Sequence, residues 1–209
     1  MKTRLVPHGT TTLPTKHGLF QCYAFQDDID GCRKEAVALV RGVVMGQRGV
    51  LVRPHSQCLT GEVFWSLKCD CREQFEYAID MINQHLRGAI IYVLEEGRGI
   101  GLMEKIRAYS LQEQGMDTID SNIAIGQEID NRKFSIESKI IQALGIESVQ
   151  LLTNNPQKIK CITEYGVVID NVVNIPVQPN HYSYSYLYTK KMLMGHQLHD
   201  LGIPPTVHE

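Results

Sequence analysis

The segment AIIYVL at residues 89–94 decides the expected fold. It is continuously apolar, a pattern typical of a central strand that is covered on both faces. Before it, apolar residues recur at helical spacing over residues 75–86. After it, a glycine-rich turn at 95–101 leads into a second helical pattern over 102–111, which stops near Gly115. A strand between two helices indicates helices layered on a sheet.

The same alternation continues downstream. Residues 136–144 show helical spacing, residues 149–152 form a short apolar strand, and a helix is expected over 156–166 because Pro156 suits a first helical position. Residues 116–132 are polar with weak periodicity and predict a long functional loop. Residues 167–209 contain a short strand pattern and a tyrosine-rich segment.

Upstream of the central strand, the chain is β-rich. Strand patterns occupy residues 19–25, 36–42 and 50–53, and glycines at 46–49 indicate a hairpin turn. Residues 1–18 contain two prolines and two glycines that interrupt regular structure. The first fifty residues are therefore expected to be mainly antiparallel β.

These patterns predict an α/β fold: a layered α/β/α domain with a mixed sheet and a β-rich N-terminal part. We expect a single domain over residues 1–209, since this length is ordinary for one domain. Loose tails are expected at 1–12 and 198–209.

Composition excludes several function classes. The formal net charge of -2 gives no basic field for nucleic acid, and no apolar run is long enough to span a membrane. The N-terminal residues lack the apolar core of a secretion signal. Six cysteines without such a signal predict a reducing, cytoplasmic setting.

Three of the cysteines are clustered in CLTGEVFWSLKCDC, residues 58–71, with the spacing C-x10-C-x-C. Three thiolates plus one open position is the arrangement of a catalytic zinc site. Asp70 and Glu73 resemble a capping box, which would place the thiols at a helix N-terminus. The cysteines could also be small buried apolar residues or a redox pair.

Four further motifs carry polar groups suited to an anionic ligand. They are RPHSQ at 53–57, EEGRGIGL at 95–102, the pair Asp130 and Arg132, and LLTNNPQK at 151–158. Glycines expose backbone N–H groups to anions, and ligands gather at the carboxyl ends of strands in α/β folds. Taken singly, each motif is also consistent with a surface loop or a solvated ion pair.

Together the motifs resemble the GTP cyclohydrolase II family over about residues 13–196. The resemblance rests on many motifs in one order: R-x-H-S-x-C-L-T-G (53–61), CDC (69–71), EGRGIGL (96–102), KIRAY (105–109), DT (117–118) and L-L-T-N-N-P-x-K (151–158).

The resemblance implies a GTP cyclohydrolase II-like fold and hydrolytic opening of the imidazole ring of GTP or a related nucleotide. Formate and pyrophosphate would leave, giving 2,5-diamino-6-ribosylamino-pyrimidinone 5'-phosphate in riboflavin synthesis. One zinc per subunit would be held by Cys58, Cys69 and Cys71, with a water in the fourth place. Magnesium would accompany the triphosphate. Family members form homodimers, so a homodimer is expected.

The resemblance also implies residue roles. Arg132 matches a residue proposed to attack the α-phosphorus, and Asp130 matches its partner base. A guanidinium is always protonated, so a phosphate-stabilising role for Arg132 is equally consistent. Tyr109 matches a tyrosine near the reacting purine. The positions that match GTP contacts are Arg53, Pro54, His55, Ser56, Gln57, Gln74, Glu96, Gly97, Arg98, Thr118, Thr153 and Lys158.

The chain departs from the family pattern at a few positions. Gln57 replaces a glutamate, Leu94-Glu95 replaces Arg-Gln, Arg72 replaces a glycine and Ala36 replaces a histidine. The losses of charge at 57 and 94 are of opposite sign, so they could compensate each other. Alternatively the chain is a divergent paralogue that opens another nucleotide or stops at another product. A non-catalytic zinc- or nucleotide-binding module is a third reading.

Overall fold

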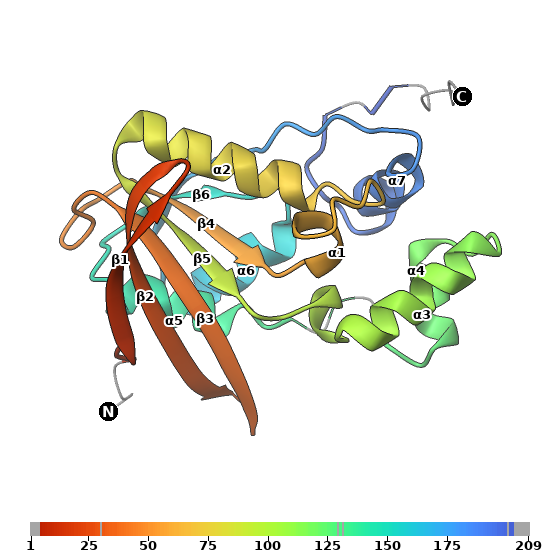
Figure 1. Cartoon of the computed structure of the whole chain (residues 1–209), viewed down its shortest axis with the longest axis horizontal. Helices are drawn as coiled ribbons and strands as arrows, with labels where there is room; N and C mark the ends of the chain where they lie inside the picture. Colours follow the sequence, from red (N-terminus) through yellow and green to blue (C-terminus); the bar gives the residue numbers. More distant parts are fainter. Residues whose placement is uncertain (1–4, 30, 129, 131, 200, 203–209) are drawn as a thin grey trace. The chain divides into compact units, whose positions relative to one another are not determined.

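The computed structural model describes residues 5–29, 31–128, 130, 132–199 and 201–202. In this part of the chain, seven strands form one mixed sheet in the order β1-β2-β3-β5-β4-β6-β7 (Figure 1). The strands are β1 (Gly9–Thr15), β2 (Gly18–Ile29), β3 (Cys32–Arg41), β4 (Val50–Ser56), β5 (Gly88–Val93), β6 (Val149–Leu152) and β7 (Ile169–Val173).

Strand direction changes at β5. Strands β1, β2, β3 and β5 pair antiparallel in that order, whereas β5, β4, β6 and β7 are parallel neighbours. Parallel neighbours need crossover connections, which here contain helices. Helix α2 (Cys71–His85) connects β4 to β5, α5 (Ser135–Ala143) precedes β6, and α6 (Pro156–Glu164) connects β6 to β7. The predicted central strand is therefore confirmed.

The apolar segment of β5 is buried on both faces because its side chains alternate between two cores. Ala89, Ile91 and Val93 join the cluster that includes residues of α5 and α6, while Ile90 joins the cluster beneath α2. All four side chains are fully buried. Figure 1 shows α2 on one face of the sheet and α5 and α6 on the other. The predicted α/β/α layering is confirmed.

Each covering helix buries a stripe of residues spaced by about one turn. In α2 the stripe includes Ala78 and Ile82, and in α5 it includes Ile136 and Ile140. Residues four apart lie on the same helical face, which is why the sequence periodicity predicted both helices.

The chain divides into two compact units. Unit 1 comprises Met1–Ser56, Phe75–Leu94 and Lys133–Ile175, and it contains the whole sheet. The single-domain assignment over 1–209 stays a prediction. Unit 2 comprises Gln57–Gln74, Glu95–Arg132 and Pro176–Glu209, with α1 (Leu59–Glu62), the start of α2, a 3-10 turn η1 (Gly97–Gly99), α3 (Leu102–Glu113), α4 (Thr118–Ala124) and α7 (Tyr184–Leu193).

Three local predictions are wrong. Residues 9–12, expected in a loose tail, form the first half of β1 and pair with β2. The turn at 46–49 does not make a hairpin, because β4 pairs with β5 and β6. The expected loop at 116–132 contains α4, whose N-cap Asp117 accepts two backbone N–H groups. A capped helix of two turns gives too short a pattern for periodicity to detect.

The C-terminal region contains the expected short strand, β7, and the tyrosine-rich segment forms α7. That helix was not predicted from the sequence. The predicted tails lie partly outside the described residues, at 1–4, 200 and 203–209. Among the helices of the described part, none combines the length and apolar character needed to cross a bilayer.

Candidate metal centre

Cys58, Cys69 and Cys71 come together within unit 2. Their three Sγ atoms lie within 4.8 Å of one another, and those of Cys58 and Cys69 are 3.7 Å apart. Two sulfurs on one tetrahedral zinc, each at about 2.3 Å, lie about 3.8 Å apart, so the spacing fits zinc without a disulfide. Among the described residues, no fourth metal-binding side chain joins the group.

The short helix α1 approaches the sulfurs through Gly61. A Cβ added at Gly61 would lie 2.8 Å from Sγ of Cys69 and 3.2 Å from Sγ of Cys58. Gly61 is buried and lies in a helical turn, so its role is close approach rather than an unusual backbone angle. Position 61 therefore requires glycine, because any side chain there would clash with the sulfur atoms.

The three thiols strongly affect one another's protonation. Hydrogen bonds from Cys69 and Cys71 hold the pKa of Cys58 well below its usual range, and the Lys105 ammonium adds to the effect. The hydrogen bond with Cys58 raises the pKa of Cys69 to about 12, and the pKa of Cys71 is also raised well above its ordinary value. A bound metal ion would replace the shared protons, since thiol ligands bind deprotonated.

A buried lysine contacts the first of these thiols. Nζ of Lys105 lies 3.1 Å from Sγ of Cys58 and 2.8 Å from Oε1 of Glu96. The other carboxylate oxygen of Glu96 accepts the backbone N–H of Leu59 at 2.6 Å. Burial opposes the charge on Lys105, but Tyr109, Cys58 and Glu96 together raise its pKa above its ordinary value. Lys105 and Glu96 therefore connect the glycine-rich turn to the start of α1.

Tyr109 lies one turn after Lys105 on α3. The Lys105 ammonium is 5.7 Å from its ring centroid, and the Lys68 ammonium is 5.0 Å from it. Burial raises the pKa of the Tyr109 phenol above its usual value, and Lys105 partly offsets this. At neutral pH this phenol is a neutral hydrogen-bond donor next to the cysteine cluster.

A second group of charged residues in unit 2 surrounds Tyr186. Arg132 donates from Nε and Nη2 to the two carboxylate oxygens of Asp130, at 2.8 and 2.5 Å. Arg98 lies 5.4 Å from the Tyr186 ring centroid, and both its terminal nitrogens are buried without a hydrogen-bond partner among the described residues. Buried donors of this kind normally have partners, and a phosphate oxygen is one acceptor that a guanidinium suits.

Comparison with known proteins identifies the family. The sequence pattern of the GTP cyclohydrolase II family matches residues 7–174. The chain belongs to the GTP cyclohydrolase II family. This is a family of hydrolases.

Three relatives give the extent of the similarity. The chain is 48% identical to the GTP cyclohydrolase-2 of Actinobacillus succinogenes, covering 90% of this chain and 85% of the relative. It is 43% identical to the GTP cyclohydrolase-2 of Picrophilus torridus, covering 90% of this chain and 97% of the relative. It is also 43% identical to the riboflavin biosynthesis protein RibBA of Phocaeicola vulgatus, covering 90% of this chain. The chain spans 46% of the length of that longer relative.

Several family-matched positions lie in unit 1, at the carboxyl ends of β4 and β6. Arg53, His55 and Lys158 are all at most 5% exposed. Nη1 of Arg53 donates to the carbonyl of Leu152 at 3.1 Å, and Nζ of Lys158 donates to the carbonyl of Pro54 at 2.8 Å. These side chains have partners inside the protein, so their contact with GTP stays a prediction.

The remaining unit 1 positions are Pro54, Ser56 and Thr153, and His55 also makes ring contacts. His55 stacks on the ring of Tyr92 at 5.6 Å between centroids and meets Phe75 edge-on at 5.2 Å. Oγ1 of Thr153 accepts the backbone N–H of Asn155, two residues on, at 3.1 Å. Ser56 is the last residue of β4.

The other family-matched positions lie in unit 2. Gln57 is half-buried directly before Cys58, and Thr118 is the first residue of α4. Nε2 of Gln74 donates to the carboxylate of Asp70 at 2.5 Å. Gly97 has a positive φ of 62° and donates its N–H to the Glu96 carboxylate. The structure thus brings Cys58, Cys69 and Cys71 together in one unit with Tyr109, and their binding of a metal stays a prediction.

Two departures from the family pattern have local explanations. Ala36 is 2% exposed and packs in the core on β3, where a small apolar residue fits. The guanidinium of Arg72 lies 3.8 Å from the Trp65 ring centroid and donates to the carbonyl of Glu62 at 3.1 Å. Arg72 therefore packs against the segment between the cysteines. Compensation between Gln57 and Leu94 stays a prediction.

Sequence reasoning missed two lysines near the cysteines. Lys105 lies in the family motif KIRAY, and its spacing of four from Tyr109 placed it on the same helical face. Lys190 follows a segment that was not predicted to be helical. Its pairing with Asp70, 120 residues away, has no signal in the local pattern.

Proposed function

We propose that this chain opens the imidazole ring of GTP by zinc-dependent hydrolysis. The products are formate, pyrophosphate and 2,5-diamino-6-ribosylamino-pyrimidinone 5'-phosphate, as a step of riboflavin biosynthesis. The buried cluster of Cys58, Cys69 and Cys71 is the observation that carries the proposal, because its spacing suits zinc. Membership of the GTP cyclohydrolase II family supports the choice of reaction and substrate.

The three cysteines hold the metal, and zinc bound by three protein ligands supplies an activated water for hydrolysis near neutral pH. Lys105 donates to Cys58 and reduces the negative charge that three thiolates concentrate. Tyr109, neutral and next to Lys105, donates a hydrogen bond to the reacting purine.

Arg132 and Arg98 bind the phosphates. The two hydrogen bonds from Arg132 to Asp130 raise the pKa of the guanidinium despite its burial. A guanidinium held in this way is a cation and a poor nucleophile, so Arg132 stabilises phosphate charge. Asp130 orients Arg132. Arg98 supplies two buried donors that lack a protein partner among the described residues.

The remaining partners follow from the family resemblance. Magnesium accompanies the triphosphate, because hard cations prefer phosphate oxygens. Two copies of the chain form a homodimer, which size-exclusion chromatography with light scattering would test. The six free cysteines suit a reducing compartment such as the cytosol.

The direct test uses purified protein with GTP, zinc and magnesium. We expect formate and pyrophosphate to form together, and mass spectrometry to identify the diaminopyrimidinone product. If GTP yields neither compound and another purine nucleotide in a substrate panel is opened, the result would favour the divergent paralogue.

Cys69→Ser separates an enzyme from a binding module. A catalytic zinc site predicts loss of turnover by more than about a thousandfold, while the sheet of unit 1 stays folded. Cys161→Ser is the matched control, since Cys161 lies on α6 in unit 1 and outside the cysteine cluster. Zinc binding without turnover in the unaltered protein would favour the non-catalytic module.

A further inference from the structure

Asp70 lies between two of the metal-binding cysteines and is itself buried. It is 5% exposed, and its Oδ1 accepts a hydrogen bond from Nζ of Lys190 at 2.7 Å. Its Oδ2 accepts from Gln74 at 2.5 Å. Both carboxylate oxygens are thus held, which fixes the backbone between Cys69 and Cys71.

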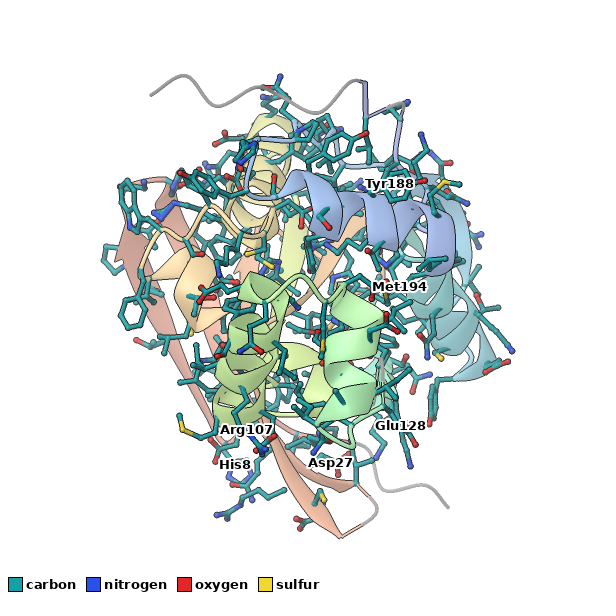
Figure 2. The ribbon with its side chains drawn as sticks, turned by 90° about the vertical axis from the view of Figure 1, so that its right-hand side faces the viewer. His8, Asp27, Arg107, Glu128, Tyr188 and Met194 are labelled. Carbon is teal, nitrogen blue, oxygen red and sulfur yellow. The ribbon has the colours of Figure 1, made fainter. Side chains whose placement is uncertain are left out.

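Lys190 belongs to α7, beyond residues 7–174 that the family pattern matches. It is 6% exposed, and its neighbours Leu187 and Thr189 are buried on the same helix. Its ammonium also lies 4.4 Å from the Tyr186 ring centroid. Figure 2 labels Tyr188 on α7, and that side chain is half-exposed, so the helix presents different sides to solvent and to the protein.

The buried ion pair between Lys190 and Asp70 is not explained by a gain in stability alone. Removing two charges from water costs several kcal/mol per ion, and apolar residues of similar volume usually stabilise as well or better. A buried pair does, however, define one geometry. In this chain the carboxylate belongs to Asp70, and the residues on either side of it are Cys69 and Cys71. What the pair secures is therefore the position of Cys69 and Cys71.

We propose that Lys190 is a positioning residue for the metal centre: α7 sets the spacing of Cys69 and Cys71 through Asp70. The inference rests on the proposed binding of zinc by the three cysteines. It makes the C-terminal helix part of the metal centre, and it assigns Asp70 to orienting the thiols rather than to contacting substrate.

The test measures zinc affinity by competition with a chromophoric chelator in the full-length protein. Asp70→Asn with Lys190→Met removes both charges while keeping the shapes of the side chains, so the fold is retained. We expect zinc binding to weaken about 10- to 100-fold, as for other groups that orient metal ligands. The thiolate-to-metal absorption of the cobalt-substituted protein should shift. Lys190→Arg with Asp70 unchanged keeps a cation beside the carboxylate, so it should retain more of the zinc affinity than the double variant does.

Lys191→Met is the matched control, because Lys191 is the next residue on α7 and contacts the His199 carbonyl instead. We expect it to bind zinc as the unaltered protein does. The inference is overturned if the double variant keeps the original zinc affinity and cobalt spectrum, even with a lowered melting temperature. That result would leave the proposed function intact. Failure of the unaltered protein to bind zinc would overturn both.

Discussion

The two units of this chain bury different kinds of side chain. Unit 1 contains both apolar clusters, which cover the two faces of the sheet. Unit 2 has few buried apolar residues and instead buries thiols and ion pairs. Its pairs are Lys105 with Glu96, Arg132 with Asp130, and Lys190 with Asp70.

This difference separates the support of the fold from the chemistry. Apolar burial depends little on pH or on metal, so unit 1 should be stable under conditions that disturb charges. Buried charges are stable only when they are paired, and clustered thiols favour a bound cation. Unit 1 also buries Arg53, His55, Glu137 and Lys158, but within a mainly apolar interior. Unit 2 should therefore respond to chelators, to loss of a charge partner and to acid more strongly than unit 1.

Removal of zinc should have the largest effect. With zinc at about 1,000 times its Kd, binding stabilises the folded state by about 4 kcal/mol, so a chelator should raise local exchange by up to about 1,000-fold. Hydrogen exchange read peptide by peptide should show this increase in α1 and at Cys69–Gln74, with β5 unchanged. Equal deprotection of β5 would show that the two units unfold together and would contradict the comparison.

Asp130→Asn should have the next largest effect. It removes the carboxylate charge that accepts two hydrogen bonds from Arg132 within a buried ion pair, which costs about 3 kcal/mol. The control is Lys139→Met in unit 1, where the pair with Asp27 is partly exposed and worth less than about 1 kcal/mol. Urea unfolding measures both: fluorescence of the single tryptophan, Trp65, follows unit 2, and far-UV circular dichroism follows the sheet of unit 1. Equal losses would remove the distinction between the two pairs.

Ile140→Ala tests the other side of the comparison. Ile140 is fully buried on α5, and truncation should cost about 2 kcal/mol because it leaves a cavity beneath the helix. The exposed Ile123 on α4 is the matched control, where the same change should cost less than about 0.5 kcal/mol. The loss at Ile140 should be the same with and without zinc. A loss that appears only without zinc would show that unit 1 depends on the metal centre.

The same contrast explains what the sequence could predict. The apolar pattern of β5 and the stripes of α2 and α5 predicted their positions in unit 1, because burial there follows local periodicity. The pairing of β4 with β5 rather than β3 was not predictable, because strand neighbours depend on crossover connections. In unit 2 the cysteine spacing predicted a cluster of three thiols, which the structure shows, and its binding of a metal stays a prediction. The contacts of Lys105 and Lys190 depend on tertiary structure and left no periodic signal.

His196 should give the smallest of these effects per pH unit, a pH dependence that begins below about pH 6.5. Burial, and then the charges of Lys190 and Arg98, lower its pKa to about 3, while Asp70 acts in the opposite direction. In the unfolded chain the His196 side chain binds a proton below about pH 6.5. In the folded chain it binds that proton only below about pH 3. Stability should fall as the pH falls through this window, by at most about 1.4 kcal/mol per pH unit.

His196→Gln should remove this slope, which urea unfolding at about pH 6.5, 5.5 and 4.5 would measure through Trp65. His199→Gln, at an exposed histidine of the same segment, should leave the slope as it is. The lowered pKa of Asp130 acts in a separate window, because that carboxylate loses its stabilising charge only below about pH 3.8. A slope that persists in His196→Gln between about pH 6.5 and 4.5 would assign the acid sensitivity of unit 2 to the cysteines, whose metal binding also releases protons.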